Sequence, residues 1–146
     1  MRRIAKLFHH TTADRSLLIK TGLLLLAVRI GLWVLPFRTV SCMLNRVSRP
    51  RGRRRECVVP SAERIAWGVS VMSRYVPKAT CLTQALTALA LLNRSGYSSE
   101  LRIGVARSEP DQIEAHAWVE NQGRIIIGAS SAILRYTPLL PRGKAP

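Results

Sequence analysis

Two short runs decide the fold of this chain: Thr80-Cys81-Leu82-Thr83-Gln84-Ala85-Leu86 and Ala115-His116-Ala117-Trp118-Val119-Glu120. In the first run, apolar residues recur at helical spacing directly after Thr80, so a helix is predicted to begin at Cys81. The second run is typical of a β-strand, in which His116 and Trp118, two residues apart, lie on the same face. The chain therefore changes from helix to sheet between these runs.

Working outward, the same reasoning predicts the other elements. Asp14 or Ser16 caps a helix that reaches about Leu35, and Ser61 caps one that reaches about Tyr75. Further helices are predicted over 37–47 and 81–93, strands over 99–105, 113–121 and 124–128, a loop over 106–112 and a tight turn over 121–123. Helices followed by a small antiparallel sheet make an α+β domain.

Composition limits the class of protein. The chain has 146 residues, of which 47% are hydrophobic, so it is long enough for one domain with a modest core. Its three cysteines, Cys42, Cys57 and Cys81, are an odd number without C-x-x-C spacing. This pattern disfavours a disulfide framework or a zinc site and favours the reducing cytoplasm. We expect no cofactor and no metal.

The chain is strongly basic, with 23 Lys and Arg against 8 Asp and Glu and a net charge of +15. Six arginines fall within residues 46–55, and such a run is either a solvated linker or an interaction segment. The charge favours polyanions, anionic lipid or acidic peptides as partners. A nucleic-acid-binding module is an alternative, but no such motif is present and aromatic residues make up only 5%.

An apolar segment near the N-terminus, residues 22–35, raises the question of a membrane. Arg29 interrupts this segment and Pro36 ends it. A membrane-spanning helix needs about 20 apolar residues, so we interpret the segment as a buried or interfacial helix. Because apolar residues beside many arginines suit an anionic leaflet, peripheral membrane association stays open for this cytoplasmic protein.

Cys81 and His116 are the candidate catalytic residues. At a helix N-terminus, unpaired N–H groups and the helix dipole favour a negative charge on the Cys81 thiol. His116 on a neighbouring strand can take a proton and return it to a leaving amine. The alternatives are a buried structural cysteine and a packed histidine. The backbone N–H of Cys81 is a candidate oxyanion donor, and Gln84 either joins it or bonds on the helix surface.

The remaining cysteines and histidines lack this setting. Cys42 falls in a short apolar helix and Cys57 follows the arginine run, so both are interpreted as structural or incidental. His9 and His10 lie in a polar terminus and are expected to be solvent-exposed.

The order of these motifs resembles a known family. The run from Cys81 to Leu86 is followed by Leu91-Leu92-Asn93-Arg94-Ser95-Gly96, by Leu101-Arg102-Ile103-Gly104-Val105 and then by the His116 run. Together with Leu35-Pro36-Phe37-Arg38 and Tyr136-Thr137-Pro138-Leu139, this order is similar to the transglutaminase-like B proteins of lasso-peptide biosynthesis, which are leader peptidases. The resemblance covers most of the chain.

The resemblance implies a papain-like cysteine protease core with a Cys-His-Asp triad, here over residues 57–146. Residues 1–56 then form a basic helical region that ends in an Arg-rich linker. Such proteins remove the leader of a ribosomally made antibiotic precursor, a separate leader-recognition protein delivers the precursor, and a lasso cyclase closes the ring. We therefore expect these three partners.

The third triad residue is where this sequence departs from the family pattern. The resemblance implies an Asp at about 128–131, but the chain has Gly128-Ala129-Ser130-Ser131 there and no acidic residue after Glu120. At strand rise, Glu120 lies roughly 13 Å and Glu114 roughly 7 Å along the strand from His116. Ser130, Ser131 or a backbone carbonyl remain as acceptors, so the third residue stays unknown. A catalytically degenerate member is the alternative.

Overall fold

The structure, a computed structural model, describes residues 12–48, 59–109, 112–131 and 133–139. Within them the helices come first: α1 (Thr12–Val34), α2 (Phe37–Val47), α3 (Ala62–Ser73) and α4 (Cys81–Arg94). The strands follow as β1 (Ser99–Glu109), β2 (Gln112–Asn121), β3 (Arg124–Ile127) and β4 (Thr137–Pro138), with the 3-10 helix η2 (Ile133–Arg135) before β4. The predicted α+β order, helices and then a small antiparallel sheet, is confirmed.

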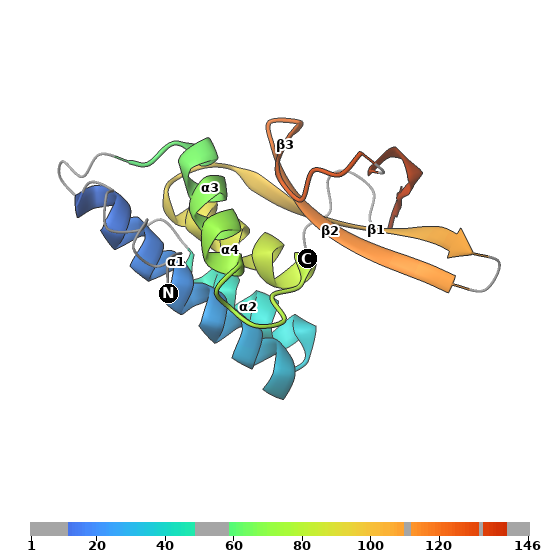
Figure 1. Cartoon of the computed structure of the whole chain (residues 1–146), viewed down its shortest axis with the longest axis horizontal. Helices are drawn as coiled ribbons and strands as arrows, with labels where there is room; N and C mark the ends of the chain where they lie inside the picture. Colours follow the sequence, from blue (N-terminus) through green and yellow to red (C-terminus); the bar gives the residue numbers. More distant parts are fainter. Residues whose placement is uncertain (1–11, 49–58, 110–111, 132, 140–146) are drawn as a thin grey trace.

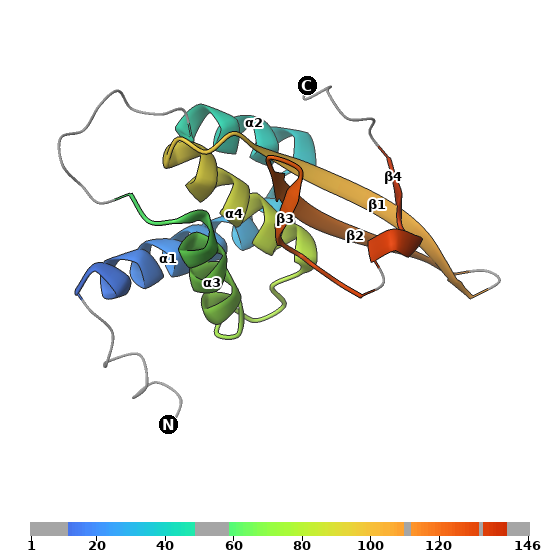
Figure 2. The ribbon, with the colours of Figure 1, turned by 90° about the horizontal axis from the view of Figure 1, so that it is seen from above.

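The helices gather on one side of a four-stranded sheet whose strand order is β3-β2-β1-β4 (Figure 1). Helix α4 is the central element, because it contacts β1 and β2 as well as α1, α2 and α3. Seen from above, the β1–β2 hairpin extends beyond the helices, and β4 lies beside β1 (Figure 2). Helix α4 therefore lies against the sheet.

Local capping explains where α3 and α4 begin and end. Ser61 accepts a hydrogen bond from the backbone N–H of Arg64, which confirms the predicted N-cap of α3. Thr80, directly before the predicted start of α4, accepts one from the backbone N–H of Thr83. After α4, Gly96 adopts φ +89° and the N–H of Tyr97 bonds back to the carbonyl of Leu92. This αL termination turns the chain from α4 into β1.

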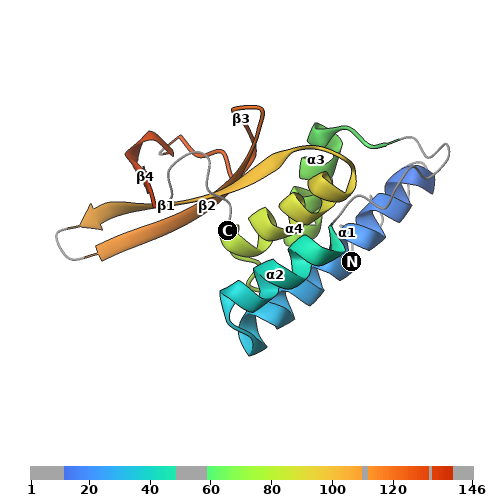
Figure 3. The same cartoon turned by 180° about the vertical axis from the view of Figure 1, so that it is seen from behind.

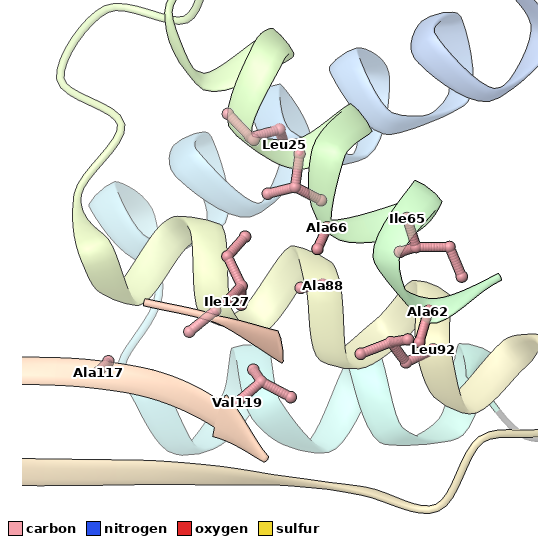
Figure 4. Close-up of a cluster of buried hydrophobic side chains, with 11 residues drawn as sticks. Leu25, Ala62, Ile65, Ala66, Ala88, Leu92, Ala117, Val119 and Ile127 are labelled. Atoms are coloured by element: carbon pink, nitrogen blue, oxygen red, sulfur yellow. The ribbon is translucent and has the colours of Figure 1, made fainter. Parts of the chain in front are cut away.

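The core lies between the helices and the sheet, as the close-up shows (Figure 4). Its buried members come from five elements: Leu25 on α1, Ala62, Ile65, Ala66 and Val69 on α3, Ala85, Ala88 and Leu92 on α4, Ala117 and Val119 on β2, and Ile127 on β3. The alanines at 85, 88 and 90 are all buried, so α4 packs closely against its neighbours. Each large side chain fully buried here contributes roughly 1.5–3 kcal/mol.

Two expectations about boundaries are wrong. Helix α1 begins at Thr12, so neither Asp14 nor Ser16 is its cap; Asp14 is buried in the first turn and pairs with Arg64 of α3. Residues 106–109 and 112, which were expected in a loop, belong to strands, because β1 continues to Glu109 and β2 begins at Gln112. The backbone pairing of β1 with β2 continues past a register shift between Arg107 and Glu109. Such pairing does not depend on buried side chains, so the apolar pattern does not reveal it.

The apolar N-terminal segment is also longer than expected. Residues Asp14–Val34 of α1 form 21 helical residues with a mean hydropathy of 1.9, long and apolar enough to cross a membrane by length and composition alone. Arg29 does not interrupt the helix. However, Leu18, Leu25 and Val28 are buried against the rest of the chain, so one side of α1 is part of the folded domain.

Several predictions lie outside the described residues. They concern the arginines of 49–55, Cys57, His9 and His10, and the boundary between 56 and 57.

Candidate active site

Cys81 is the first residue of α4, as its motif predicted. Thr80 precedes it in an extended conformation and caps the helix, so the chain enters α4 in one defined direction. Because the first N–H groups of a helix have no acceptor inside it, the backbone N–H of Cys81 is available to an incoming group. The Cys81 thiol is free and partly exposed. A nucleophile and an N–H donor thus meet at one helix end.

His116 lies on β2 at the point where this strand enters the body of the protein. Residues 112–115 are exposed, His116 is half-buried, and 117–119 are buried. The Nε2 atom of His116 lies 2.8 Å from the carbonyl oxygen of Gly128. A carbonyl oxygen only accepts, so Nε2 carries the proton and, in the neutral ring, Nδ1 is left as the base.

Gly128 is the residue that brings this carbonyl to the ring. It follows the last residue of β3 and has φ +84°, in the left-handed region that glycine favours. A Cβ at this position would lie 2.8 Å from both the carbonyl oxygen of Ala117 and the Cβ of Trp118. The backbone therefore approaches β2 more closely than any residue with a side chain would allow. The resemblance described above implies an Asp in this region, and here a main-chain oxygen contacts the histidine instead.

Two aromatic rings flank His116. The Trp118 ring stacks on it at 6.2 Å between centroids and 20° between planes, and Tyr136 lies at 5.3 Å and 35°. Gly104, paired with His116 across β1 and β2, makes room for this cluster, because a Cβ there would lie 3.0 Å from the Trp118 ring and from Tyr136. The rings and the Gly128 carbonyl together fix the imidazole plane.

A cavity of about 150 Å³ joins the candidate residues. Its lining combines α4 with the ends of β2 and β3: Cys81, Gln84, Ala85, His116, Ala117, Ile127 and Gly128. Within this cavity the described hydrogen bonds include none between the Cys81 thiol and the His116 ring. Catalytic hydrogen bonds are often long before substrate binds, so this separation is compatible with a later proton transfer.

Gln84 combines both of the positions considered for it. Its side chain lines the cavity, one turn after Cys81, and its Nε2 donates a long bond of 3.5 Å to the carbonyl of Ala79. A bond of that length is weak, so the amide can turn towards an oxyanion at low cost. The roles of Cys81, His116 and Gln84 in catalysis stay predictions.

The two nearby glutamates are engaged elsewhere. Glu120 accepts a 2.9 Å hydrogen bond from Nε1 of Trp118 and lies 3.5 Å from Nε of Arg102, which is buried. Glu114 lies 3.4 Å from the hydroxyl of Tyr136. Glu120 therefore supports the Trp118 ring behind His116, and neither carboxylate is the partner that the structure gives to the imidazole.

The other candidate groups do not join this cavity. Cys42 is an exposed free thiol on α2. A larger and more open hollow of about 490 Å³ is lined by Asp14, Ser61, Glu63, Arg64 and Trp67, without a thiol or an imidazole among them. In the part of the chain that the structure describes, no three His, Cys, Asp or Glu side chains gather in a way that would hold a metal ion.

The geometry agrees with a family comparison. A family model described as the transglutaminase-like superfamily matches residues 22–141. The chain belongs to the transglutaminase-like superfamily. Enzymes of this superfamily are typically cysteine proteases or transferases. Comparisons with curated proteins and with solved structures gave no significant match.

The region that matches the transglutaminase-like superfamily begins at Gly22 in α1 and includes the sheet. Reasoning from the sequence alone missed Gly104 as a packing position and Tyr136 as a ring contact. An isolated glycine within a strand pattern indicates close approach of another group, and that signal was available at Gly104. No local signal identifies Tyr136, because its contact with His116 depends on β4 pairing with β1.

Proposed function

We propose that this transglutaminase-like protein is a cysteine endopeptidase that removes the leader from a lasso-peptide precursor. The observation that carries the proposal is that Cys81, at the start of α4, and His116, held by Gly128, line the same cavity. Enzymes of this superfamily are typically cysteine proteases or transferases. The motif order described above favours the leader peptidases among them. The proposed partners are the precursor, a separate leader-recognition protein and a lasso cyclase.

The first chemical step follows from the tautomer of His116. Nδ1 takes the proton of the Cys81 thiol, and Sγ forms a bond to the scissile carbonyl carbon. The carbonyl oxygen becomes an oxyanion, which the backbone N–H of Cys81 and the amide of Gln84 stabilise. The Gly128 carbonyl keeps its hydrogen bond throughout, because Nε2 carries a proton in both the neutral and the charged ring.

The second step completes the hydrolysis. His116 gives its Nδ1 proton to the leaving nitrogen, and the C–N bond breaks. Water then attacks the thioester with His116 again as base, which releases the leader as a carboxylate and restores the thiol. The freed amine of the core peptide is the group that a cyclase would join to a side-chain carboxyl. The whole sequence requires only the precursor and water.

The test is intact mass spectrometry of a cognate precursor incubated with the protein and its leader-recognition partner. Cys81→Ala should lower the rate of leader release by at least about 10³-fold, because the nucleophile is removed. Cys42→Ala is the matched control, since it removes an exposed free thiol on α2 and should leave the rate unchanged. Leader release that persists in Cys81→Ala would refute the proposal.

A catalytically degenerate binding protein is the second candidate. The observation that favours it is the neutral Gly128 carbonyl, which stabilises a charged imidazole less than a carboxylate would. The same experiment separates the two functions: a precursor that binds with equal affinity to the wild type and to Cys81→Ala, and that is cut by neither, would identify a binding protein.

A further inference from the structure

The outward side of α1 is apolar where a surface helix is normally polar. Its large exposed side chains are Ile19, Leu23, Leu26, Ile30, Trp33 and Val34, which we call the α1 apolar face. Their spacing of three or four residues places them on one stripe of the helix. Trp33 is 83% exposed and Leu23 65% exposed, so these side chains are not covered by the rest of the chain.

The opposite side of α1 is buried in the domain. Leu18, Thr21, Leu25 and Val28 are all at most 3% exposed and contact the other helices. The segment is long and apolar enough to cross a bilayer, but a transmembrane position would break the contacts of this buried side with α3 and α4. A helix with one side held by its own domain and one apolar side exposed is suited to lie along a membrane surface.

The charge carried by α1 and α2 indicates the kind of surface that the α1 apolar face fits. Helices α1 and α2 carry Arg15, Lys20, Arg29, Arg38 and Arg46, against the single acidic residue Asp14, which pairs with Arg64. The chain as a whole carries +15. Basic side chains beside an apolar stripe match anionic headgroups above an acyl layer. Trp33 adds an aromatic ring of the kind enriched at membrane–water interfaces.

We propose that the α1 apolar face docks flat on an anionic membrane surface. From behind, α1 runs along one edge of the molecule, with α4 between it and the sheet (Figure 3). The cavity lined by Cys81 and His116 lies between α4 and the sheet, so a bilayer on the far side of α1 leaves that cavity open. This membrane docking is independent of the peptidase activity proposed above.

The test is flotation of the full-length protein with two sets of vesicles, one of phosphatidylcholine alone and one with 30% phosphatidylserine. Wild type should float with the anionic vesicles and bind them more weakly as salt rises. Ile30→Glu should lower the partition by tenfold or more, because it places a charge in the apolar stripe. Ile113→Glu is the matched control: the same exchange on β2, at a side chain 72% exposed, should leave binding unchanged.

Further outcomes decide the proposal. If Ile30→Glu unfolds by circular dichroism, Trp33→Glu replaces it, because Trp33 is the most exposed residue of the α1 apolar face. Anionic-vesicle binding that is equal in wild type and in these variants would assign binding to the arginines alone and overturn docking by α1. Absence of binding, or equal binding to neutral vesicles, would also overturn it. If the wild type forms dimers in sedimentation and Ile30→Glu does not, the α1 apolar face binds a second copy of this chain instead of a membrane.

Discussion

His116 is oriented by the main chain, through a 2.8 Å contact between its Nε2 atom and the carbonyl oxygen of Gly128. In a Cys-His-Asp triad a carboxylate fixes the tautomer and also stabilises the imidazolium. A carbonyl fixes the same tautomer with a partial charge only. The imidazole therefore has a tautomer-fixing partner but lacks the charge of a carboxylate, and if the site is catalytic we expect a slow enzyme.

Gly128→Ala tests this arrangement directly. The added Cβ meets Ala117 and Trp118 at 2.8 Å, and alanine tolerates φ +84° poorly, so the chain must move away from β2. We expect a loss of about 1–3 kcal/mol of unfolding free energy. We also expect a fall in kcat that exceeds any change in KM, because the imidazole loses its acceptor. Urea unfolding and steady-state cleavage kinetics measure the two effects.

Gly96→Ala is the control for the backbone strain alone. Gly96 has φ +89°, close to that of Gly128, but nothing lies within 4 Å of an added Cβ. Its cost should stay at about 1–2 kcal/mol, the cost of the left-handed conformation alone, with the cleavage rate unchanged. If both variants lower kcat equally, the Gly128 carbonyl has no special role.

Arg102→Met should be strongly destabilising, although arginine on a strand is usually a surface residue. The Arg102 side chain is 8% exposed and pairs with Glu100 at 2.8 Å and with Glu120 at 3.5 Å. Removing it leaves the half-buried Glu120 without a cation, at a cost of about 3 kcal/mol. Arg124→Met is the control, because its pair with Glu63 is exposed and should be worth less than about 1 kcal/mol. Thermal unfolding that ranks the two equally would contradict the buried network.

The substitution of glycine by alanine should change the free energy of unfolding in opposite directions at Gly104 and at Gly31. Gly104→Ala places a Cβ 3.0 Å from the Trp118 ring and from Tyr136, so it should cost about 1–3 kcal/mol and displace the rings beside His116. Gly31→Ala, inside α1, meets only Val40 at 3.5 Å or more, and should stabilise by up to about 1 kcal/mol through helix propensity. Chemical unfolding of both variants gives the comparison, and stabilisation by Gly104→Ala would refute the packing role of that position.

Local signals predicted the elements that carry the candidate site. The apolar period after Thr80 predicted a helix that begins at Cys81, and the structure matches it. The capping bond to Thr80 and the turn at Gly96 are equally local, because both act within this one helix. The partner of His116 was one of several alternatives, because a main-chain carbonyl leaves no signature in the side chains. Its position depends on the turn that Gly128 makes after β3, and only the folded sheet shows it.

Non-local pairing accounts for most of what was missed. The extension of β1 to Glu109 rests on backbone bonds of an exposed hairpin, and β4 has only two residues, Thr137 and Pro138, paired with β1. Neither has enough alternation to be recognised. Similarly, α1 is apolar on both sides from Gly22 onward, so its pattern alone does not separate the buried side from the α1 apolar face.

The place of α1 in the domain gives a last prediction. Leu25 is fully buried in the cluster that includes Ile65 and Val119, whereas Leu23, on the same helix, is 65% exposed. Leu25→Ala should therefore cost about 2–5 kcal/mol, and Leu23→Ala less than about 0.5 kcal/mol. Both changes remove the same atoms from the same helix, so helix propensity cancels and the difference in urea unfolding measures tertiary packing. A single cooperative transition that shifts for Leu25→Ala would mean that α1 unfolds together with α3 and the sheet. An unchanged transition in both variants would instead support a separate N-terminal region that ends near residue 56.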